Sequence, residues 1–209
     1  MKTDETVFIV DDDAAVRDSL RALLESAGFR VEDFASAAAF LDSSTPERQG
    51  CLVVDIRMPD MDGLELQEEL IRRRIALPAI VMTGHADVPL AVRAMKAGAV
   101  DFIEKPFKEE VLLDGVGRAL ETGRLRRDHA AYAETSTRLL AGLTLREREV
   151  LEHLVAGKAN KMIAHDLGIS PRTVEVHRAN LMEKMQARTL SDLVRMALEA
   201  GVGLAGRPG

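Results

Sequence analysis

Short hydrophobic runs alternate with amphipathic stretches along the first part of the chain. The short runs are rich in Val, Ile and Leu, as buried strands are, and the longer stretches carry apolar side chains at helical spacing. The expected strands cover residues 7–10, 30–34, 52–54, 79–82 and 100–103, and the expected helices include 36–41, 64–74 and 88–97. Within 64–74, we expect Leu66, Leu70 and Ile71 to face the core. Strands that alternate with helices predict a doubly wound, five-stranded parallel sheet with helices on both faces.

The pattern changes after residue 142, where only helical spacing continues. Thr144 and Glu147 form a capping box at the start of the first helix, and Ser170 and Thr189 can cap later ones. The four expected helices cover residues 144–156, 160–167, 170–185 and 189–200. The tight turn between the second and the third predicts a helix-turn-helix. A plain four-helix bundle with a solvated charged face is equally compatible with this spacing alone.

The stretch 124–142 is polar, compatible with a helix and free of proline. We interpret it as a partly helical linker, and the residues leave a disordered tether open as the alternative. The expected organisation is therefore a first domain at 1–123, a linker at 124–142 and a second domain at 143–209.

Composition and charge refine this organisation. The chain has 46% hydrophobic and 30% charged residues and one cysteine, which fits a globular protein in a reducing cytosol. Its polar first six residues and the lack of an apolar run of about 20 residues predict a cytoplasmic protein with no membrane segment. The net charge of -6 is uneven: residues 1–123 hold 14 Lys and Arg against 24 Asp and Glu, whereas residues 143–209 hold 10 against 8. Two modules with different partners are expected.

Polar residues follow most of the expected strands of the first domain. Asp11 and Asp12, Asp55, Thr83 and Lys105 would all meet at the carboxyl edge of a parallel sheet. Clustered carboxylates repel unless a cation neutralises them, and ligands that are all oxygen favour Mg²⁺. The lysine and the hydroxyl would then hold a phosphoryl group carried on one of the carboxylates. The alternative is a set of helix caps beside a solvated lysine.

Four segments carry a resemblance to a known family: VDDD (10–13), VVDIRMPDMDG (53–63), VMTGHAD (81–87) and DFIEKPF (101–107). Residues 5–121 resemble the receiver domain of two-component response regulators, which implies a flavodoxin-like α/β fold. The resemblance implies that Asp55 is the phosphoacceptor. It also implies that Asp12 and Asp55 bind Mg²⁺ directly together with the backbone carbonyl of Arg57, and that Asp11 acts through water.

The same resemblance assigns the remaining groups of the pocket. Lys105 pairs with the phosphoryl oxygens, Thr83 is the switch hydroxyl and Phe102 is the aromatic residue coupled to it. Many receivers have tyrosine where Phe102 stands, so any reorientation here would act through packing alone. The Lys105-Pro106 peptide is commonly cis in this family. Asp13 is expected to cap a helix and not to bind metal.

The second domain offers a candidate DNA surface. The N-terminal outer face of a recognition helix meets base edges, and neighbouring cations meet phosphates. The expected base-facing residues are Arg172, Thr173, Glu175, Val176 and Ala179, and the expected phosphate contacts are Lys161 and Arg178, with Lys158 and Lys184 as further candidates. Residues 143–185 resemble the LuxR-type DNA-binding domain. Glu175 stands where lysine is common in that family, so the target sequence cannot be transferred.

Together the two resemblances imply a FixJ-type response regulator. We expect a transcriptional activator that is phosphorylated by a sensor histidine kinase, binds double-stranded promoter DNA and contacts RNA polymerase. It would be a monomer until phosphorylation makes it a homodimer through a face that includes Val92, Met95, Lys96 and Ile103. It would be no enzyme, although it would assist its own phosphorylation and dephosphorylation.

Two alternatives from other classes remain. A phosphatase-like hydrolase would need a second acid two residues after the nucleophile, where Arg57 stands. A phosphoryl-relay protein would use its second domain to bind protein instead of DNA.

Overall fold

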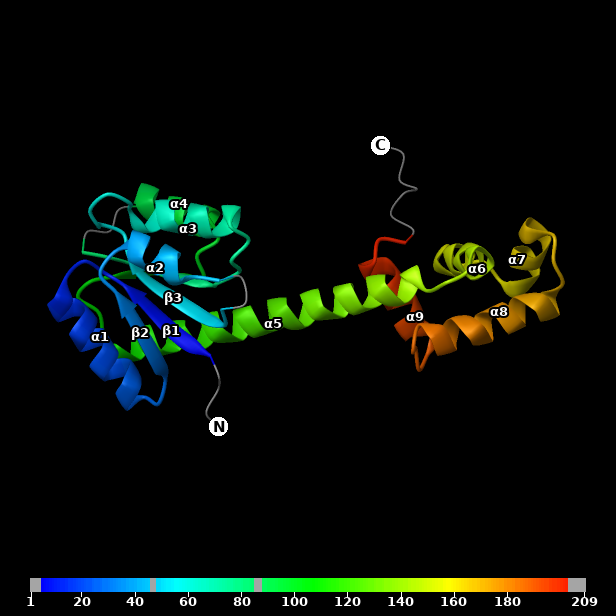
Figure 1. Cartoon of the computed structure of the whole chain (residues 1–209), viewed down its shortest axis with the longest axis horizontal. Helices are drawn as coiled ribbons and strands as arrows, with labels where there is room; N and C mark the ends of the chain where they lie inside the picture. Colours follow the sequence, from blue (N-terminus) through cyan, green and yellow to red (C-terminus); the bar gives the residue numbers. More distant parts are fainter. Residues whose placement is uncertain (1–4, 46–47, 85–87, 203–209) are drawn as a thin grey trace. The chain divides into compact units, whose positions relative to one another are not determined.

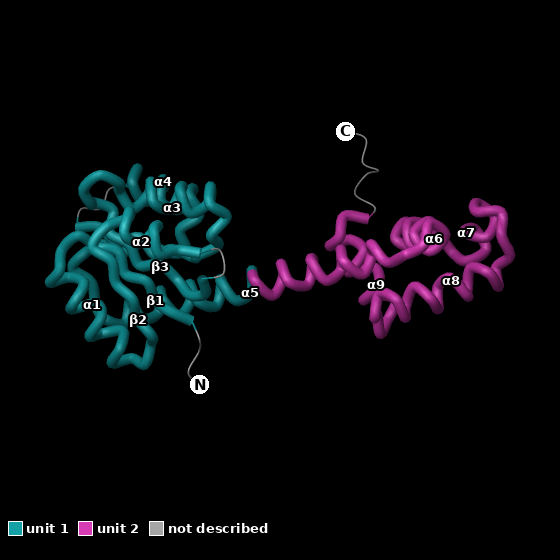
Figure 2. The backbone as a smooth tube through the Cα atoms, in the orientation of Figure 1, with its two compact units in different colours: residues 1–126 teal, residues 127–209 magenta. Residues whose placement is uncertain are grey.

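The computed structural model describes residues 5–45, 48–84 and 88–202, so His85 and its two neighbours in the VMTGHAD segment lie outside the described residues (Figure 1). The chain folds as two compact units, residues 1–126 and residues 127–209, and the division falls within one long helix (Figure 2). None of the helices formed by the described residues is both long enough and apolar enough to cross a membrane.

The first unit alternates strands and helices as the sequence predicts. The strands are β1 (Thr6–Val10), β2 (Arg30–Phe34), β3 (Gly50–Asp55), β4 (Ala79–Thr83) and β5 (Asp101–Glu104). The helices are α1 (Ala14–Ser26), α2 (Ala37–Ser43), α3 (Gly63–Arg72), α4 (Val88–Lys96) and α5 (Glu109–Ala141), the last of which continues into the second unit.

The sheet is parallel throughout, with strand order β2-β1-β3-β4-β5. This is the flavodoxin-like order, and the predicted doubly wound fold is confirmed. In this order the chain reverses direction across the sheet between β1 and β3, where ligands of open α/β sheets bind. Val10 pairs with Val54, and Asp55 pairs with Met82, so the polar residues that follow β1 and β3 lie at one edge.

Two cores cover the two faces of this sheet, because successive side chains of a strand point to opposite sides. Phe8 and Leu52 pack with α2, α3 and α4 on one face, whereas Val7 and Val53 pack with α1 and α5 on the other. Figure 1 shows these two layers of helices. Because β1, β3 and β4 are fully buried, polar groups at their ends are held on a rigid frame.

The prediction that Ile71 faces the core is wrong. Ile71 is 62% exposed, although Leu66 and Leu70 of the same helix are buried as expected. Ile71 lies in the last turn of α3, and Arg74 then adopts a positive φ of 59°. This turn brings Ile75 into the core, where its backbone N–H donates to the Leu70 carbonyl at 2.9 Å, so Ile75 occupies the place expected for Ile71.

The second unit contains the end of α5 and four further helices. These are α6 (Leu145–Val155), α7 (Asn160–Leu167), α8 (Pro171–Lys184) and α9 (Leu190–Glu199). The side chains of Thr144, Ser170 and Thr189 cap α6, α8 and α9 as predicted. Gly168 ends α7 with a φ of 64°, a left-handed conformation that suits glycine, and so allows the tight turn into α8. The helix-turn-helix of the prediction is therefore α7 and α8.

Residues 124–141 of the stretch expected to be a partly helical linker lie within α5. Its last turns belong to the second unit. Leu140 is buried in that unit's core and Tyr132 packs against it. Arg195 of α9 lies over the Tyr132 ring at 5.4 Å and donates from Nε to its hydroxyl at 3.1 Å.

Candidate functional site

Three predicted residues meet at the carboxyl edge of the sheet. Asp11 follows β1, Asp55 ends β3 and Lys105 follows β5. The Lys105 ammonium donates to Asp11 Oδ2 and to Asp55 Oδ1, each at 2.7 Å. Asp11 is 1% exposed and Asp55 6% exposed, so one cation bridges two carboxylates that are almost removed from water. The alternative of a solvated lysine beside helix caps does not describe this arrangement.

The backbone around Asp55 is shaped by the residues that follow it. Its Oδ2 accepts the N–H of Arg57 at 2.6 Å, so both carboxylate oxygens are engaged. Asp62 caps α3 through the N–H groups of Leu64 and Glu65. A Cβ on Gly63 would lie 2.4 Å from the Asp55 carbonyl oxygen, so only glycine lets α3 begin this close to the strand end.

Burial and charge oppose each other in this pocket. Burial raises the pKa of Asp55 above its ordinary 3.8, and the charge of Asp11 adds to that rise. The hydrogen bond and charge of Lys105 lower the pKa of Asp55 without cancelling the effect of burial. Burial alone would lower the pKa of Lys105, but its bonds to Asp11 and Asp55 outweigh that and raise it. Lys105 is therefore held as a cation beside the Asp55 carboxyl, which burial makes more basic.

The predicted magnesium ligands are only partly brought together. Asp11 and Asp55 converge, and carboxylate oxygens suit Mg²⁺, as does the backbone carbonyl predicted for Arg57. Asp12 lies on the exposed surface of the same loop, outside the pair of carboxylates that Lys105 bridges. Within the described ranges, no three acidic, histidine or cysteine side chains are arranged to hold a metal. The carboxylates of Asp11 and Asp55 therefore fit a hard cation, whereas Asp12 lies next to them on the surface of the loop.

The switch residues lie beside this pocket. Thr83 ends β4 and is fully buried, and its carbonyl accepts the backbone N–H of Lys105 at 2.7 Å. Phe102 on β5 pairs with Val81 and is half-buried against the core on the α3 and α4 side. The Lys105-Pro106 peptide is cis, as the resemblance to receiver domains implies. Asp13 caps α1 through the N–H of Ala15 at 2.8 Å, which confirms its predicted role.

The candidate DNA surface lies on α7 and α8. Lys161, Arg172, Glu175, Val176 and Ala179 are exposed, and Val176 exposes 53% of its surface. Thr173 is half-buried, and its hydroxyl is hydrogen-bonded to that of Ser170 at 2.8 Å. This places an arginine, an acid and an apolar residue together on the first half of the recognition helix.

Comparison with known proteins gives the family. Residues 7–116 match the response regulator receiver domain, and residues 141–197 match the bacterial regulatory proteins of the luxR family. The transcriptional regulatory protein FixJ of Azorhizobium caulinodans is 57% identical over 203 residues, which cover 95% of this chain and 94% of that protein. The chain belongs to the FixJ-type two-component response regulators. A FixJ-type regulator joins a receiver domain, which implies a sensor kinase as partner, to a LuxR-type domain, which implies DNA binding.

Further relatives span the same two domains. FixJ of Rhizobium meliloti is 53% identical, with 96% of this chain and 98% of that protein covered. Among solved structures, the response regulator StyR is similar with a TM-score of 0.79 at 46% identity, covering 94% of this chain and all of that one. Full-length FixJ from B. japonicum gives a TM-score of 0.58 at 50% identity, with 95% and 98% covered. The similarity of this FixJ-type regulator to its relatives is therefore not confined to one domain.

Some of the predicted cations of the FixJ-type regulator already have protein partners. Lys184 Nζ donates to Glu147 Oε2 and Lys158 Nζ donates to Asp166 Oδ2, at 2.8 and 2.7 Å. Arg178 Nη1 donates to the side-chain oxygen of Asn160 at 2.8 Å. The bonds of Lys184 and Arg178 join α8 to α6 and to α7, whereas the bond of Lys158 joins the loop before α7 to that helix. Lys161 and Arg172 are the exposed cations that remain on the predicted surface.

The predicted dimer face needs one correction. Val92 and Met95 are 46% and 50% exposed and, with Ala91 and Lys96, line a shallow hollow of about 380 Å³ on α4. Ile103 is only 3% exposed, because its side chain points to the opposite face of the sheet and packs in the core under α1 and α5. Ile103 therefore cannot form part of an exposed contact surface.

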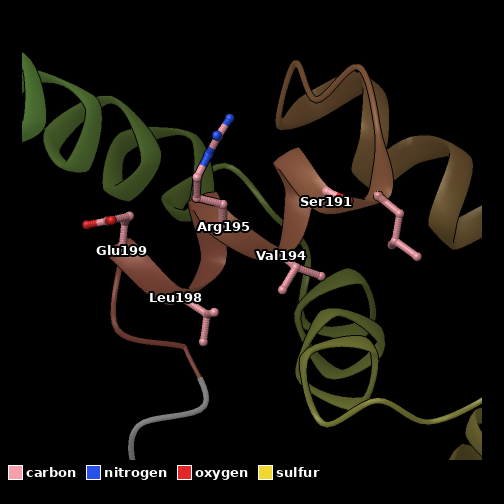
Figure 3. Close-up of a pocket in the computed structure, with 6 residues that line it drawn as sticks. Ser191, Val194, Arg195, Leu198 and Glu199 are labelled. Carbon is pink, nitrogen blue, oxygen red and sulfur yellow. The ribbon is translucent and has the colours of Figure 1, made fainter.

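A second hollow, of about 470 Å³, lies on α9 (Figure 3). It is lined by Leu190, Ser191, Val194, Arg195, Leu198 and Glu199. All six belong to one helix that carries none of the predicted DNA contacts, so the hollow is not part of the candidate DNA surface.

Sequence reasoning missed two residues of the receiver site. One is Gly63, whose signal is the Asp-Gly pair just before a helical pattern. The other is Arg17 of α1, whose Nη1 donates to the backbone carbonyls of Asp11 and Asp12 at 2.8 and 3.1 Å. Nothing in the helical spacing of α1 distinguishes Arg17 from an ordinary surface arginine, so only the structure reveals it.

Proposed function

We propose that Asp55 is the phosphoacceptor of this response regulator. Among the predicted site residues it alone is an acid that ends a central buried strand and is bonded to the pocket lysine. Burial raises the pKa of Asp55, which makes its carboxylate a better nucleophile once ionised. Lys105 lies 2.7 Å from Asp55 Oδ1, where it can neutralise charge on an incoming phosphoryl group.

Mg²⁺ is the cofactor of this proposal. Asp11, Asp12, Asp55 and the Arg57 carbonyl would hold it, and it would supply positive charge to the transferring phosphoryl oxygens. Asp55 would be correctly oriented because the Arg57 N–H already fixes its Oδ2 at 2.6 Å. The same groups would assist hydrolysis of the phosphoryl group, so the regulator would limit the lifetime of its own active state.

Phosphorylation would be transmitted through Thr83 and Phe102 to α4. Thr83 is linked to Lys105 by a 2.7 Å backbone hydrogen bond, and Phe102 packs against the core that includes Ala94 of α4. The exposed surface of Val92, Met95 and Lys96 would then form a homodimer, whereas the unphosphorylated chain would be a monomer. A dimer would present two copies of α8 to two half-sites of double-stranded promoter DNA.

The remaining partners follow from the two domains. A sensor histidine kinase would donate the phosphoryl group, and the regulator would act in the cytoplasm as an activator that contacts RNA polymerase. On the DNA surface, Arg172, Thr173, Glu175, Val176 and Ala179 would face bases, and Lys161 and Arg178 would face phosphates. Arg178 would have to exchange its bond with Asn160 for a phosphate contact.

The phosphoacceptor is tested on the full chain with acetyl phosphate and Mg²⁺, followed by phosphate-affinity electrophoresis. Asp55→Asn should abolish the mobility shift. Asp60→Asn is the matched control, because Asp60 lies five residues later on the exposed loop and should shift as the wild type does. Full modification of the Asp55→Asn variant would show that the acceptor is another residue.

A further inference from the structure

The loop that carries Asp11 and Asp12 is held by one side chain from the next helix. Nη1 of Arg17 donates to the carbonyl oxygens of both Asp11 and Asp12, at 2.8 and 3.1 Å. Nε of Arg17 donates to Asp33 Oδ2 of β2 at 3.2 Å. The arginine side chain is 15% exposed and that of Asp33 22% exposed, so the bonds to Asp33 and to the Asp11 carbonyl are partly shielded from water, whereas the bond to the Asp12 carbonyl is exposed.

The held loop is also part of the pocket. Asp11 uses its Oδ1 to accept the N–H of Asp13 at 2.9 Å and its Oδ2 to accept from Lys105. The Asp12 side chain has no comparable anchor: it is exposed, and its position depends on the backbone that carries it. Arg17 fixes that backbone at two successive peptide groups, and Asp33 fixes Arg17.

We propose that Arg17 is a positioning residue for the magnesium site. It acts through the loop: by fixing the carbonyls of Asp11 and Asp12, it sets where their carboxylates lie for the cation. This inference rests on the proposed function, because it takes Asp11, Asp12 and Asp55 as the ligand set. Groups outside the ligands themselves commonly orient metal ligands in this way, and their loss typically weakens metal binding by roughly 10- to 100-fold.

The chemistry of the side chain explains why arginine is needed. A guanidinium is planar, stays charged and presents several N–H groups in fixed directions. It can therefore meet two carbonyls with one nitrogen and a carboxylate with another. A lysine ammonium at this position would keep the charge, but it is a single point on a flexible stem and cannot reproduce this fixed set of contacts.

The sign of the effect separates positioning from simple electrostatics. Arg17 is a cation close to a site for a cation, so its charge alone disfavours Mg²⁺. If charge were its only influence, Arg17→Ala would bind Mg²⁺ more tightly than the wild type. If Arg17 positions the loop, Arg17→Ala binds Mg²⁺ more weakly despite the lost repulsion, and Arg17→Lys is also weakened although its charge is kept.

Arg21 provides a matched control. It lies one turn further along α1 and forms ion pairs with the same Asp33 and with Glu25, but it donates to neither loop carbonyl. Arg21→Ala therefore removes a cation and an ion pair to β2 without releasing the loop. Its Mg²⁺ affinity should stay within about twofold of the wild type, since exposed ion pairs contribute little.

The experiment measures Mg²⁺ binding to the full, unphosphorylated chain by isothermal titration calorimetry. We expect Arg17→Ala to raise the dissociation constant roughly 10-fold or more, and Arg17→Lys to raise it by a smaller factor. Thermal unfolding by circular dichroism shows whether each variant is folded, and Arg17→Lys carries the test if Arg17→Ala is not. An unchanged or tighter affinity in a folded Arg17 variant, or an equal loss in Arg21→Ala, would overturn the proposal.

A second measurement separates this proposal from the proposed function. In phosphorylation by acetyl phosphate, the Arg17 variants should need more Mg²⁺ for half-maximal rate, whereas the rate at saturating Mg²⁺ should be within about twofold of the wild type. Asp55→Asn is run beside them. If Asp55→Asn is still modified, the phosphoacceptor assignment fails whatever the Arg17 variants do. If only the Mg²⁺ dependence of the Arg17 variants is normal, the positioning role alone fails.

Discussion

The ion pair between Glu147 and Lys184 gives a quantitative test of the DNA-binding unit. Glu147 is 3% exposed and lies in the first turn of α6, where its Oε2 accepts hydrogen bonds from the N–H of Thr144 and from Nζ of Lys184, both at 2.8 Å. The hydrogen bond from Lys184 is the largest cause that holds the pKa of Glu147 at about 2, below its ordinary 4.5. Because Lys184 ends α8, this pair ties the recognition helix to the first helix of the unit.

The magnitude follows from the pKa. A drop from 4.5 to about 2 corresponds to roughly 3 kcal/mol at about 1.4 kcal/mol per unit, which is an upper bound. The Lys184 side chain is 41% exposed, so water screens the pair, and we expect Glu147→Gln to lower the free energy of unfolding by about 1–2 kcal/mol at pH 7. Because the folded-state pKa is depressed, this stabilisation is complete above about 4.5 and is lost as pH falls toward 2. At pH 3 the difference between wild type and variant should shrink to about half or less.

The chain itself supplies a selective probe for this test. It has one tyrosine and no tryptophan, and Tyr132 packs against the core of the second unit. Tyrosine fluorescence during urea unfolding of the full chain therefore reports on that unit alone. Glu149→Gln is the matched control, because Glu149 pairs with Arg146 on the exposed side of the same helix and should change stability by less than about 0.5 kcal/mol. Equal losses in the two variants, or a Glu147→Gln loss that does not diminish toward pH 3, would refute this account of the pair.

Further predictions concern the pocket and the DNA surface. Burial raises the pKa of Asp55 above 3.8, so the protonated carboxyl stabilises the folded receiver. This stabilisation is complete below pH 3.8 and is lost as pH rises through the folded-state pKa of Asp55. In thermal unfolding measured against pH, Asp55→Asn should therefore remove this loss of stability. Gly63→Ala should destabilise the receiver by roughly 1–3 kcal/mol and slow phosphorylation, because its Cβ would meet the Asp55 carbonyl. Lys161→Ala should weaken binding to all DNA sequences and lower the salt slope by about 1, whereas Glu175→Ala should change sequence preference in a binding-site selection.

The receiver site was predictable because chain direction does most of the positioning. Once the strands are parallel and ordered β2-β1-β3-β4-β5, residues that follow β1, β3 and β5 must share one edge. Asp11, Asp55 and Lys105 could therefore be placed together from the sequence pattern. The position of Asp12 could not be predicted in this way. A shift of one residue along an irregular loop decides whether a carboxylate enters the pocket or stays on the surface.

The burial of Ile103 and the bond of Lys184 depend on what each residue meets from a distant segment. Phe102 and Ile103 alternate on β5, and the sequence cannot say that α5 covers the Ile103 side. Lys184 looks like a phosphate contact when its helix is read alone. Its partner Glu147 lies 37 residues earlier and becomes its neighbour only when α6 packs on α8.

The charges of the pocket explain why phosphorylation at Asp55 would need both a lysine and a metal. Asp11, Asp55 and Lys105 together carry one net negative charge while the lysine bridges the two acids. A phosphoryl group would add further negative charge, which a single ammonium that already makes both bonds cannot neutralise. A divalent cation can, and it would free Lys105 to move toward the phosphoryl oxygens. Because the backbone N–H of Lys105 is bonded to the Thr83 carbonyl, such a movement would act directly on the end of β4.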